Sequence, residues 1–224
     1  MALHWMLTVV LLLSGVLLLA TKLAYHWPRI AAARIHPEPG RKLRGAKLYP
    51  RVLGNMIFSG ALVFVLVYST KPWLIADGEA SWGRLLFDAA LVLLLYDFLY
   101  YWMHRVAFHQ WGPLRKVHVV HHAVRHPHSV DSLYLHPVET FLGLALLVVC
   151  SMIVGPVHAG TFTIAFTVYS FLNILVHCGL DLPFFPLRAI SFLARKHDVH
   201  HTSMKGGNYA SLTPIFDKLF GTAE

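Results

Sequence analysis

The hydrophobic pattern of the chain is dominated by five apolar stretches separated by polar segments. These stretches cover residues 5–21, 52–70, 85–103, 138–154 and 157–176. Each contains about 17 to 20 residues, close to the length that an α-helix needs to cross the hydrocarbon core of a bilayer. The pattern predicts an all-α integral membrane protein with four to five transmembrane helices, folded as a single membrane domain over residues 1–224.

Two of the stretches bear on topology. The fourth is, together with the first, the shortest, and only Gly155-Pro156 separates it from the fifth. We expect the two to form a tight hairpin that returns the chain to the same side, whether or not it crosses fully. The first stretch has the position of a signal peptide, but Met1 to Trp5 contain no Lys or Arg and a basic segment follows at once. We therefore expect a retained helix.

Composition supports a membrane location. The chain has 224 residues, of which 56% are hydrophobic and 13% charged, whereas a soluble domain averages about 25% charged residues. The two cysteines, Cys150 and Cys178, lie in or beside apolar stretches and suggest no disulfide framework. The net charge of +8 does not indicate a nucleic-acid partner, because the basic residues flank the apolar stretches instead of alternating with aromatic residues.

The distribution of Lys and Arg predicts the orientation. Eight lie in residues 22–51, four in 104–137 and five after His177, and all three segments fall on one side of the predicted helices. Only Lys71 and Arg84 lie on the other side. The positive-inside rule places the basic side in the cytoplasm and the N-terminus outside. The expected location is a bacterial inner membrane or the endoplasmic reticulum.

The chain contains sixteen histidines, an unusually high number for its length, and many of them are clustered on the predicted cytosolic side. The clusters are His104 with His109, then His118 with His121 and His122, then His197 with His200 and His201. On a helix, an HxxHH motif presents its imidazoles to one side. Neutral imidazole is a common metal ligand. A chance polar helix face explains one such motif but not two copies and a further pair, and eight imidazoles indicate two ions.

Other polar residues are candidates beside these clusters. His136 and His177 are further candidate ligands, although a histidine before proline also suits a helix N-terminus. Asn173 lies one turn before His177, where it serves either the metal, directly or through water, or an interhelical hydrogen bond. Asp97 lies seven residues before His104 inside an apolar stretch, and we expect a carboxylate there to orient imidazole N–H groups. The other candidate carboxylates are Asp131, Glu139, Asp181 and Asp198; the histidines expected to be bystanders are His4, His26, His36, His126, His128 and His158.

Taken in order, these motifs resemble the fatty acid hydroxylase/sterol desaturase superfamily. The matching stretches run from Asp97 through YYWMHRVAFH, HVVHH, HPVE, HCGLDLP, HDVHH and GGNYASLTPIFDKLFGT. Their order and spacing are most similar to the branch that includes C4-methylsterol oxidases and C5-sterol desaturases. The resemblance covers residues 88–222, more than half of the chain, and the paired HxxHH motifs with the terminal stretch are highly specific together.

The resemblance implies a cytosolic histidine-rich helical cap, a non-haem di-iron centre, O2 as co-substrate, and hydroxylation or desaturation of a lipid. It carries the ligand role to His104, His109, His118, His121, His122, His177, His197, His200 and His201. Where some relatives have an HxxxH pair, this chain has Asn173 and His177, so His136 or Asn173 is left to fill one ligand position. Zinc is expected to replace iron readily during purification, because imidazole binds both metals.

The function expected from the sequence is O2-dependent hydroxylation of a lipid C–H bond, with desaturation at the same centre as the alternative. The chain contains no GxGxxG or P-loop motif. Electrons are therefore expected from a separate ferredoxin or cytochrome with its reductase. A non-catalytic metal-binding protein or transporter is the alternative of another class, but the apolar stretches contain few polar groups. The substrate, whether fatty acyl, sterol-like or polar lipid, is not fixed by the motifs.

The end of the chain predicts one more helix. Leu212, Ile215, Phe216, Leu219 and Phe220 follow the spacing of an amphipathic helix, with Asp217 and Lys218 on the opposite, polar face. We expect its apolar face to pack against the bilayer edge or the helices beneath the metal cap, so that it seals the site and holds the His200-His201 segment in place. The alternative is an ordinary packing helix with no bearing on the site.

Overall fold

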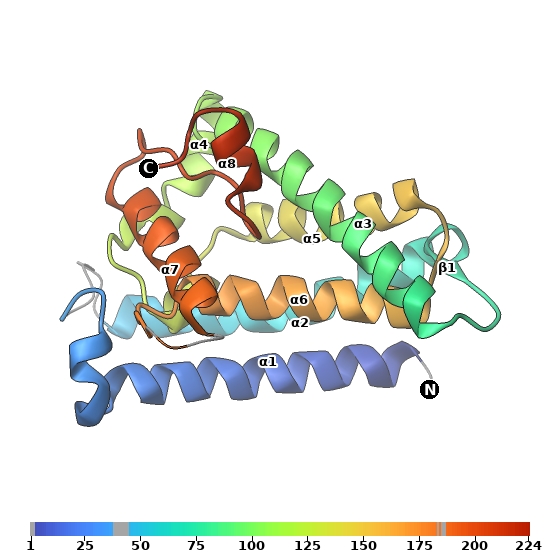
Figure 1. The fold of residues 1–224 in the computed structure, drawn as a ribbon, viewed down its shortest axis with the longest axis horizontal. Helices are drawn as coiled ribbons and strands as arrows, with labels where there is room; N and C mark the ends of the chain where they lie inside the picture. The colour runs from blue at the N-terminus through green and yellow to red at the C-terminus, as the bar shows by residue number, and fades with distance from the viewer. Residues whose placement is uncertain (1–2, 38–44, 183, 185–186) are drawn as a thin grey trace.

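The computed structural model describes residues 3–37, 45–182, 184 and 187–224. Five long helices form the body of the protein (Figure 1): α1 (Leu3–His26), α2 (Gly45–Leu74), α3 (Trp82–Trp102), α5 (Pro137–Val154) and α6 (Ala159–Val176). Each is long and apolar enough to cross a membrane. The structure therefore confirms the prediction of an all-α protein with up to five spans, and the helices extend beyond the apolar stretches at several ends.

The helices α5 and α6 form the centre of the bundle. Helices α2 and α3 pack on α5, while α1 and α3 pack on α6. The α5–α6 hairpin turns at Gly155, whose φ of 123° suits glycine. Directly after the turn, β2 (Val157–His158) pairs in parallel with β1 (Ile75–Ala76) and so ties this connection to the one between α2 and α3.

Helix α1 lies at the periphery of the bundle. Only Leu7, Val10 and Tyr25 are buried in it, whereas leucines and valines such as Leu12 and Val16 are exposed. An exposed apolar helix surface of this extent is the expected surface for contact with lipid chains.

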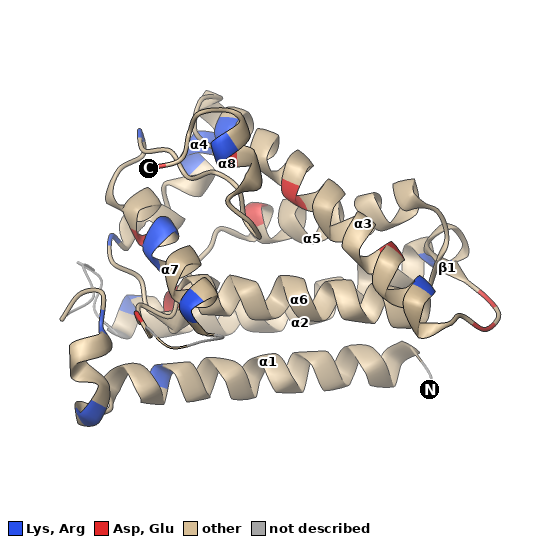
Figure 2. Cartoon of the chain, viewed as in Figure 1, with Lys and Arg blue, Asp and Glu red and all other residues tan. Residues whose placement is uncertain are grey.

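Short helices form a cap at the end of the bundle remote from β1 (Figure 1). Within the described chain these are η1 (Pro28–Ala33), the π-helix η2 (Met103–Phe108), α4 (Gly112–His118), η3 (His121–Ala123), η4 (Ser129–Leu133), α7 (Leu187–Thr202) and α8 (Ile215–Leu219). Figure 2 shows that Lys and Arg gather mainly around this end. The cap carries the histidine motifs.

The structure corrects the expected helix near the end of the chain. Helix α8 contains only five residues, Ile215–Leu219, and does not begin at Leu212. Asp217 is fully buried instead of facing solvent. Its carboxylate accepts hydrogen bonds from the backbone N–H groups of Tyr209 and Ala210, at 2.7 and 3.0 Å, and pairs with Lys196 at 2.8 Å. The 3.6-residue period placed Asp217 on the polar face, but a neighbouring loop covers that face.

Candidate metal centre

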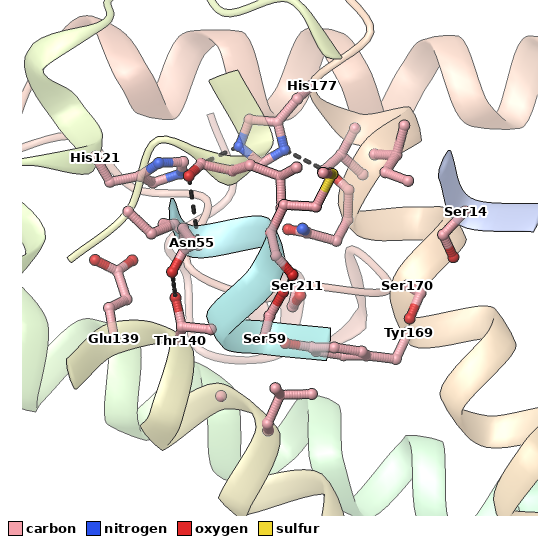
Figure 3. A pocket seen from close by; sticks show the side chains of 18 of the residues that line it. Ser14, Asn55, Ser59, His121, Glu139, Thr140, Tyr169, Ser170, His177 and Ser211 are labelled. Carbon is pink, nitrogen blue, oxygen red and sulfur yellow. Dashed lines mark hydrogen bonds between the residues drawn. The ribbon is translucent and has the colours of Figure 1, made fainter. Parts of the chain in front are cut away.

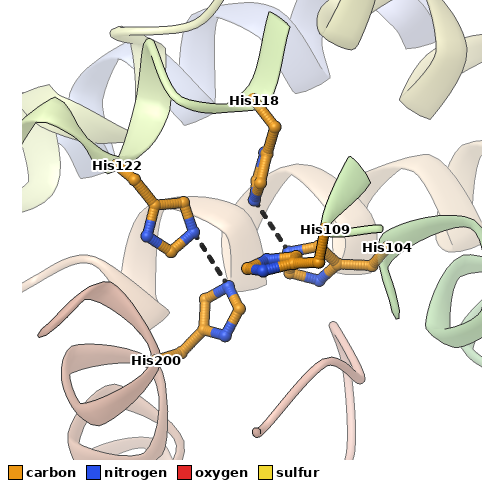
Figure 4. A group of neighbouring side chains, drawn as sticks. All are labelled: His104, His109, His118, His122 and His200. Atoms are coloured by element: carbon orange, nitrogen blue, oxygen red, sulfur yellow. Dashed lines mark hydrogen bonds between the residues drawn. The ribbon is translucent and has the colours of Figure 1, made fainter. Parts of the chain in front are cut away.

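The cap brings nine of the ten predicted histidine ligands together in two groups. Within each group, one ring nitrogen from every histidine lies within 4.8 Å of the corresponding nitrogens of the others. The first group contains His104, His109, His118, His122 and His200 (Figure 4). The second group contains His121, His177, His197 and His201. All are buried except His197, which is partly exposed.

Both HxxHH motifs are shared between the two groups. In α7, His197 and His201 belong to the second group, whereas His200 belongs to the first. Residues i and i+4 lie on one face of an α-helix, and residue i+3 is turned about 100° away from i+4. The other motif divides in the same way, although His118 ends α4 and His121 lies in the separate helix η3. Each HxxHH motif therefore contributes histidines to both groups.

The spacing between His104 and His109 depends on the π-helix η2. In an α-helix, residues five apart point in directions about 140° apart. Here the His109 N–H donates to the His104 carbonyl at 3.1 Å, the i→i+5 bond of a π-helix. That bond stacks the two residues on one side, and π-helical turns of this kind are frequent at functional sites. The local widening of the helix thus brings both imidazoles into the first group.

Hydrogen bonds on the outer ring nitrogens fix the orientation of most of these imidazoles. In six of the nine, Nδ1 donates to an oxygen at 2.6–2.9 Å, which directs Nε2 toward the group. The acceptors are the carbonyls of Tyr209 for His104, Met204 for His109, Gly207 for His200, Asn173 for His177 and Val124 for His201, and the Glu139 carboxylate for His118. This is the arrangement that orients histidines at metal sites.

These hydrogen bonds leave the Nε2 atoms, which face the interior of each group, without a proton. A carbonyl or carboxylate oxygen only accepts hydrogen bonds, so a neutral imidazole that donates from Nδ1 has a lone pair on Nε2. The Nε2 atoms of His104 and His118 nevertheless lie 3.0 Å apart. The buried Nε2 of His109 has no hydrogen-bond partner. Converging lone pairs repel one another unless a cation lies between them, and a metal ion satisfies them together.

Protonation does not provide that cation at neutral pH. Burial lowers the pKa of His109 and His177 to about 4. Burial, together with neighbouring imidazoles, also lowers the pKa of His200 and His201 well below the ordinary value. These four imidazoles are therefore neutral at pH 7, which is the form that binds metal. The donor set fits Fe, Zn, Cu or Ni and does not select among them.

The remaining predicted site residues lie elsewhere around the centre. His136 belongs to neither group, and its Nδ1 accepts a hydrogen bond from the backbone N–H of Val138 at the start of α5. Asn173 lines a cavity beside the centre, and its backbone carbonyl accepts the bond from His177. Fully buried Asp97 is bonded to the backbone of residues 211–213 instead of to an imidazole.

Glu139 is the candidate carboxylate that contacts one of the nine histidines. Its Oε1 lies 2.8 Å from Nδ1 of His118, and the side chain is buried. Its other oxygen, Oε2, is buried without a hydrogen-bond partner. The sequence indicated Glu139 only as one of several carboxylates. The carbonyls that hold His104, His109 and His200 were not predicted, since backbone acceptors in a loop have no side-chain signature. Only the proximity of GGNYAS to the last motif hints at two of them, those of Gly207 and Tyr209.

A cavity of about 300 Å³ adjoins the centre between α1, α2, α3, α5 and α6. Histidines of both groups line it, among them His104 and His118 of the first and His121 and His177 of the second. Figure 3 shows His121 at the left of the view, His177 near the top and Ser14 of α1 at the right. Leu11, Leu18, Met56, Leu144 and Phe166 give much of the lining an apolar surface. Polar side chains also line it, among them Asn55, Thr140 and Tyr169. The volume suits a small ligand or part of a lipid.

Gly207 offers a direct test of how the loop after α7 supports the first group. A methyl group at this position would overlap the Thr222 carbonyl, whereas a methyl group at Gly206 would meet its neighbours at ordinary van der Waals distance, 3.4 Å or more. We expect Gly207→Ala to cost about 1–3 kcal/mol of stability through overpacking and to lower metal content, because the Gly207 carbonyl holds His200. Thermal unfolding and metal analysis will measure both effects. Equal behaviour of the control Gly206→Ala would refute this role.

Comparison of the sequence with known proteins identifies a matching family and several related proteins. Residues 89–222 match the model of a family described as fatty acid hydroxylase. A methylsterol monooxygenase of Arabidopsis thaliana is 34% identical over 154 residues, 63% of this chain and 54% of that protein. A very-long-chain aldehyde decarbonylase of Oryza sativa subsp. indica is 30% identical over 181 residues, 76% of this chain and 28% of that protein. The chain thus spans between about a quarter and somewhat over half of such relatives. No solved structure matches.

Proposed function

Because the chain belongs to the fatty acid hydroxylase family, we propose that it is a membrane-bound oxidoreductase that hydroxylates a C–H bond of a lipid with O2 at two iron ions. The observation that carries this proposal is the cavity, which lies among membrane-type helices and reaches histidines of both groups. A lipid in it would have one carbon beside the centre. Desaturation at the same centre is the alternative reaction.

Each part of the site has a role in this proposal. Two bound iron ions would activate O2, which is the oxidant that the reaction of an inert alkyl C–H bond requires. The nine histidines of the two groups would hold them. The apolar wall formed by Leu18, Leu144 and Phe166 would align the lipid. Glu139 would keep the His118 tautomer fixed, because its carboxylate accepts from Nδ1. Asn173 would act on a ligand through water, since it lines the cavity, and Asp97 would hold residues 211–213 beneath the cap.

The whole chain would act as one membrane domain. Helix α1 precedes the region that matches the family, yet it packs on α6 and lines the cavity with Leu11, Ser14, Gly15 and Leu18. The substrate site would therefore be incomplete without α1. The electrons would come from an external ferredoxin or cytochrome with its reductase, and the basic cap would attract an acidic donor.

The orientation follows from the positive charge around the cap. We propose that the cap faces the cytoplasm and that the N-terminus lies outside. Single cysteines at Gly78, in the β1–α3 connection, and at Gly206, in the cap, allow a test by labelling intact cells with a membrane-impermeant thiol reagent, in a background without Cys150 and Cys178. We expect labelling of Gly78→Cys only. Labelling of Gly206→Cys from outside would reverse the assignment.

The function itself is tested with the purified protein and with intact cells. We expect about two metal ions per chain in the two histidine groups, consumption of O2 when a reductant is added to the iron-loaded protein, and an oxidised lipid that appears only in cells carrying the gene. Lipid analysis by mass spectrometry would distinguish an added oxygen atom from a new double bond. Metal binding without O2 consumption or a lipid product would favour a non-catalytic metal-binding protein or transporter instead.

A further inference from the structure

A third cluster of ligand-type side chains lies at the edge of the cap, separate from the two histidine groups. It contains His36, which follows η1, His126 between η3 and η4, and Asp198 on α7. Nε2 of His36 lies 2.9 Å from Oδ2 of Asp198, and Nδ1 of His126 lies 3.2 Å from Oδ1. One ligand atom from each residue lies within 4.8 Å of the others. Three segments that are distant in sequence thus converge on one carboxylate.

The position of Asp198 on α7 separates this cluster from the main centre. Asp198 follows His197 and precedes His200 by two residues, so its side chain points about 160° away from His200 around the helix. It lies only about 60° from His201, but its oxygens are not among the ligand atoms of the second group. It is 7% exposed, and a buried carboxylate needs a partner. Two imidazoles and one carboxylate form a donor set used by divalent transition metals such as zinc and iron. The carboxylate also offsets part of the charge of a divalent ion.

Exposure distinguishes this cluster from the two buried groups. The His36 side chain is 38% exposed, so water has access to complete the coordination of an ion. The rings of His36 and His126 lie against each other in a tilted arrangement, with centroids 3.6 Å apart and planes 35° apart. They would open slightly to admit an ion, and the exposed position of His36 leaves room for this movement.

We propose that His36, His126 and Asp198 bind a third divalent ion, of the zinc class, which fastens the segment after α1 to the cap. Backbone bonds already join these parts, since Ile35 N–H donates to the Gly179 carbonyl at 2.9 Å and Asp181 N–H donates to the Ala33 carbonyl at 2.7 Å. The ion extends this link to α7. Helix α1 has few buried residues and so little packing of its own to hold it in place. The ion adds a link that holds the cap end of α1 against the metal centre.

The experiment uses the full chain in detergent, equilibrated with excess zinc and freed of unbound metal. We expect three zinc ions per chain, one of which a brief treatment with chelator removes well before the other two. His36→Gln removes the imidazole but keeps an amide N–H that donates to Asp198, so a purely hydrogen-bonded cluster would be preserved. We expect this variant, and also His126→Gln, to lose one ion of three and the fast phase of release. His26→Gln, a change of an exposed histidine at the end of α1, should keep all three.

The outcomes separate this proposal from the dinuclear one. Two ions in the wild type, or three in both His36→Gln and His126→Gln, would overturn the third site. A single ion that disappears in both variants would support the third site while refuting the main pair. Absence of bound zinc from the wild type would refute both proposals.

Discussion

Replacement of His200 by alanine is expected to abolish turnover and to reduce bound metal. Nε2 of His200 lies 3.1 Å from that of His122 in the first group, and its Nδ1 donates to the Gly207 carbonyl at 2.7 Å. The substitution removes one of the five imidazoles of that group and leaves a buried carbonyl without its donor. Changes in residues that merely support ligands cost about 10- to 100-fold, so we expect a loss of at least about 100-fold in product formation.

His158→Ala is the matched control for this loss. His158 lies in β2, at the opposite end of the bundle from the cap, where its Nδ1 accepts a hydrogen bond from the Gly160 N–H at the start of α6. Loss of such a cap costs about 1 kcal/mol of stability and should leave metal content and turnover intact. Product formation and metal per chain would be measured for both variants. If both lost metal equally, the assignment of His200 to the centre would be wrong.

Truncation after Tyr209 is expected to produce a protein that inserts in the membrane but holds little metal and shows no turnover. The removed segment contains Asp217, which fixes the backbone of Tyr209 and so the carbonyl that accepts from His104. It also contains the three N–H groups that bond to Asp97. A buried carboxylate deprived of its partners is strongly destabilising, by about 3–5 kcal/mol when an ion pair is broken in this way.

Leu219→Ala distinguishes a specific role of this segment from general sensitivity of the chain end. Leu219 is 68% exposed on α8, and its apolar side chain takes no part in the hydrogen bonds and ion pair of Asp217. The variant should retain metal and product formation at the level of the wild type. Membrane fractionation and metal analysis of the truncated chain complete the comparison. Normal metal content after truncation would show that residues beyond Tyr209 do not support the centre.

The membrane helices could be predicted because hydrophobic length is a property of the sequence alone. The hairpin at Gly155 was likewise evident from its Gly-Pro pair, and the structure places a positive φ there. The predicted ends of the helices were less accurate. A helix continues past its apolar stretch because the backbone of polar residues can form the same helical hydrogen bonds. Helix α2, for example, begins at Gly45 and not at Val52. The expected helix from Leu212 was wrong in its length because tertiary contacts, not periodicity, determine the backbone around Asp217.

The histidine motifs were evident from spacing, but their division between two groups was not. That division depends on how α4, η3 and α7 approach one another, which a one-dimensional pattern does not contain. Asp97 illustrates the same limit. Its distance of seven residues from His104 placed it on the correct helix face, yet its partners are backbone N–H groups of residues 211–213, more than a hundred positions away. The π-helix that aligns His104 with His109 also has no recognisable sequence signature.

The sharing of each HxxHH motif between both groups has a consequence for biosynthesis. A nascent chain that has not yet released α7 lacks His200 of the first group and both His197 and His201 of the second. The second group would then be reduced to His121 and His177, too few to retain an ion firmly. Metal loading of the second group is therefore expected to follow the insertion of α1 to α6, so that the walls of the cavity assemble before this group is filled.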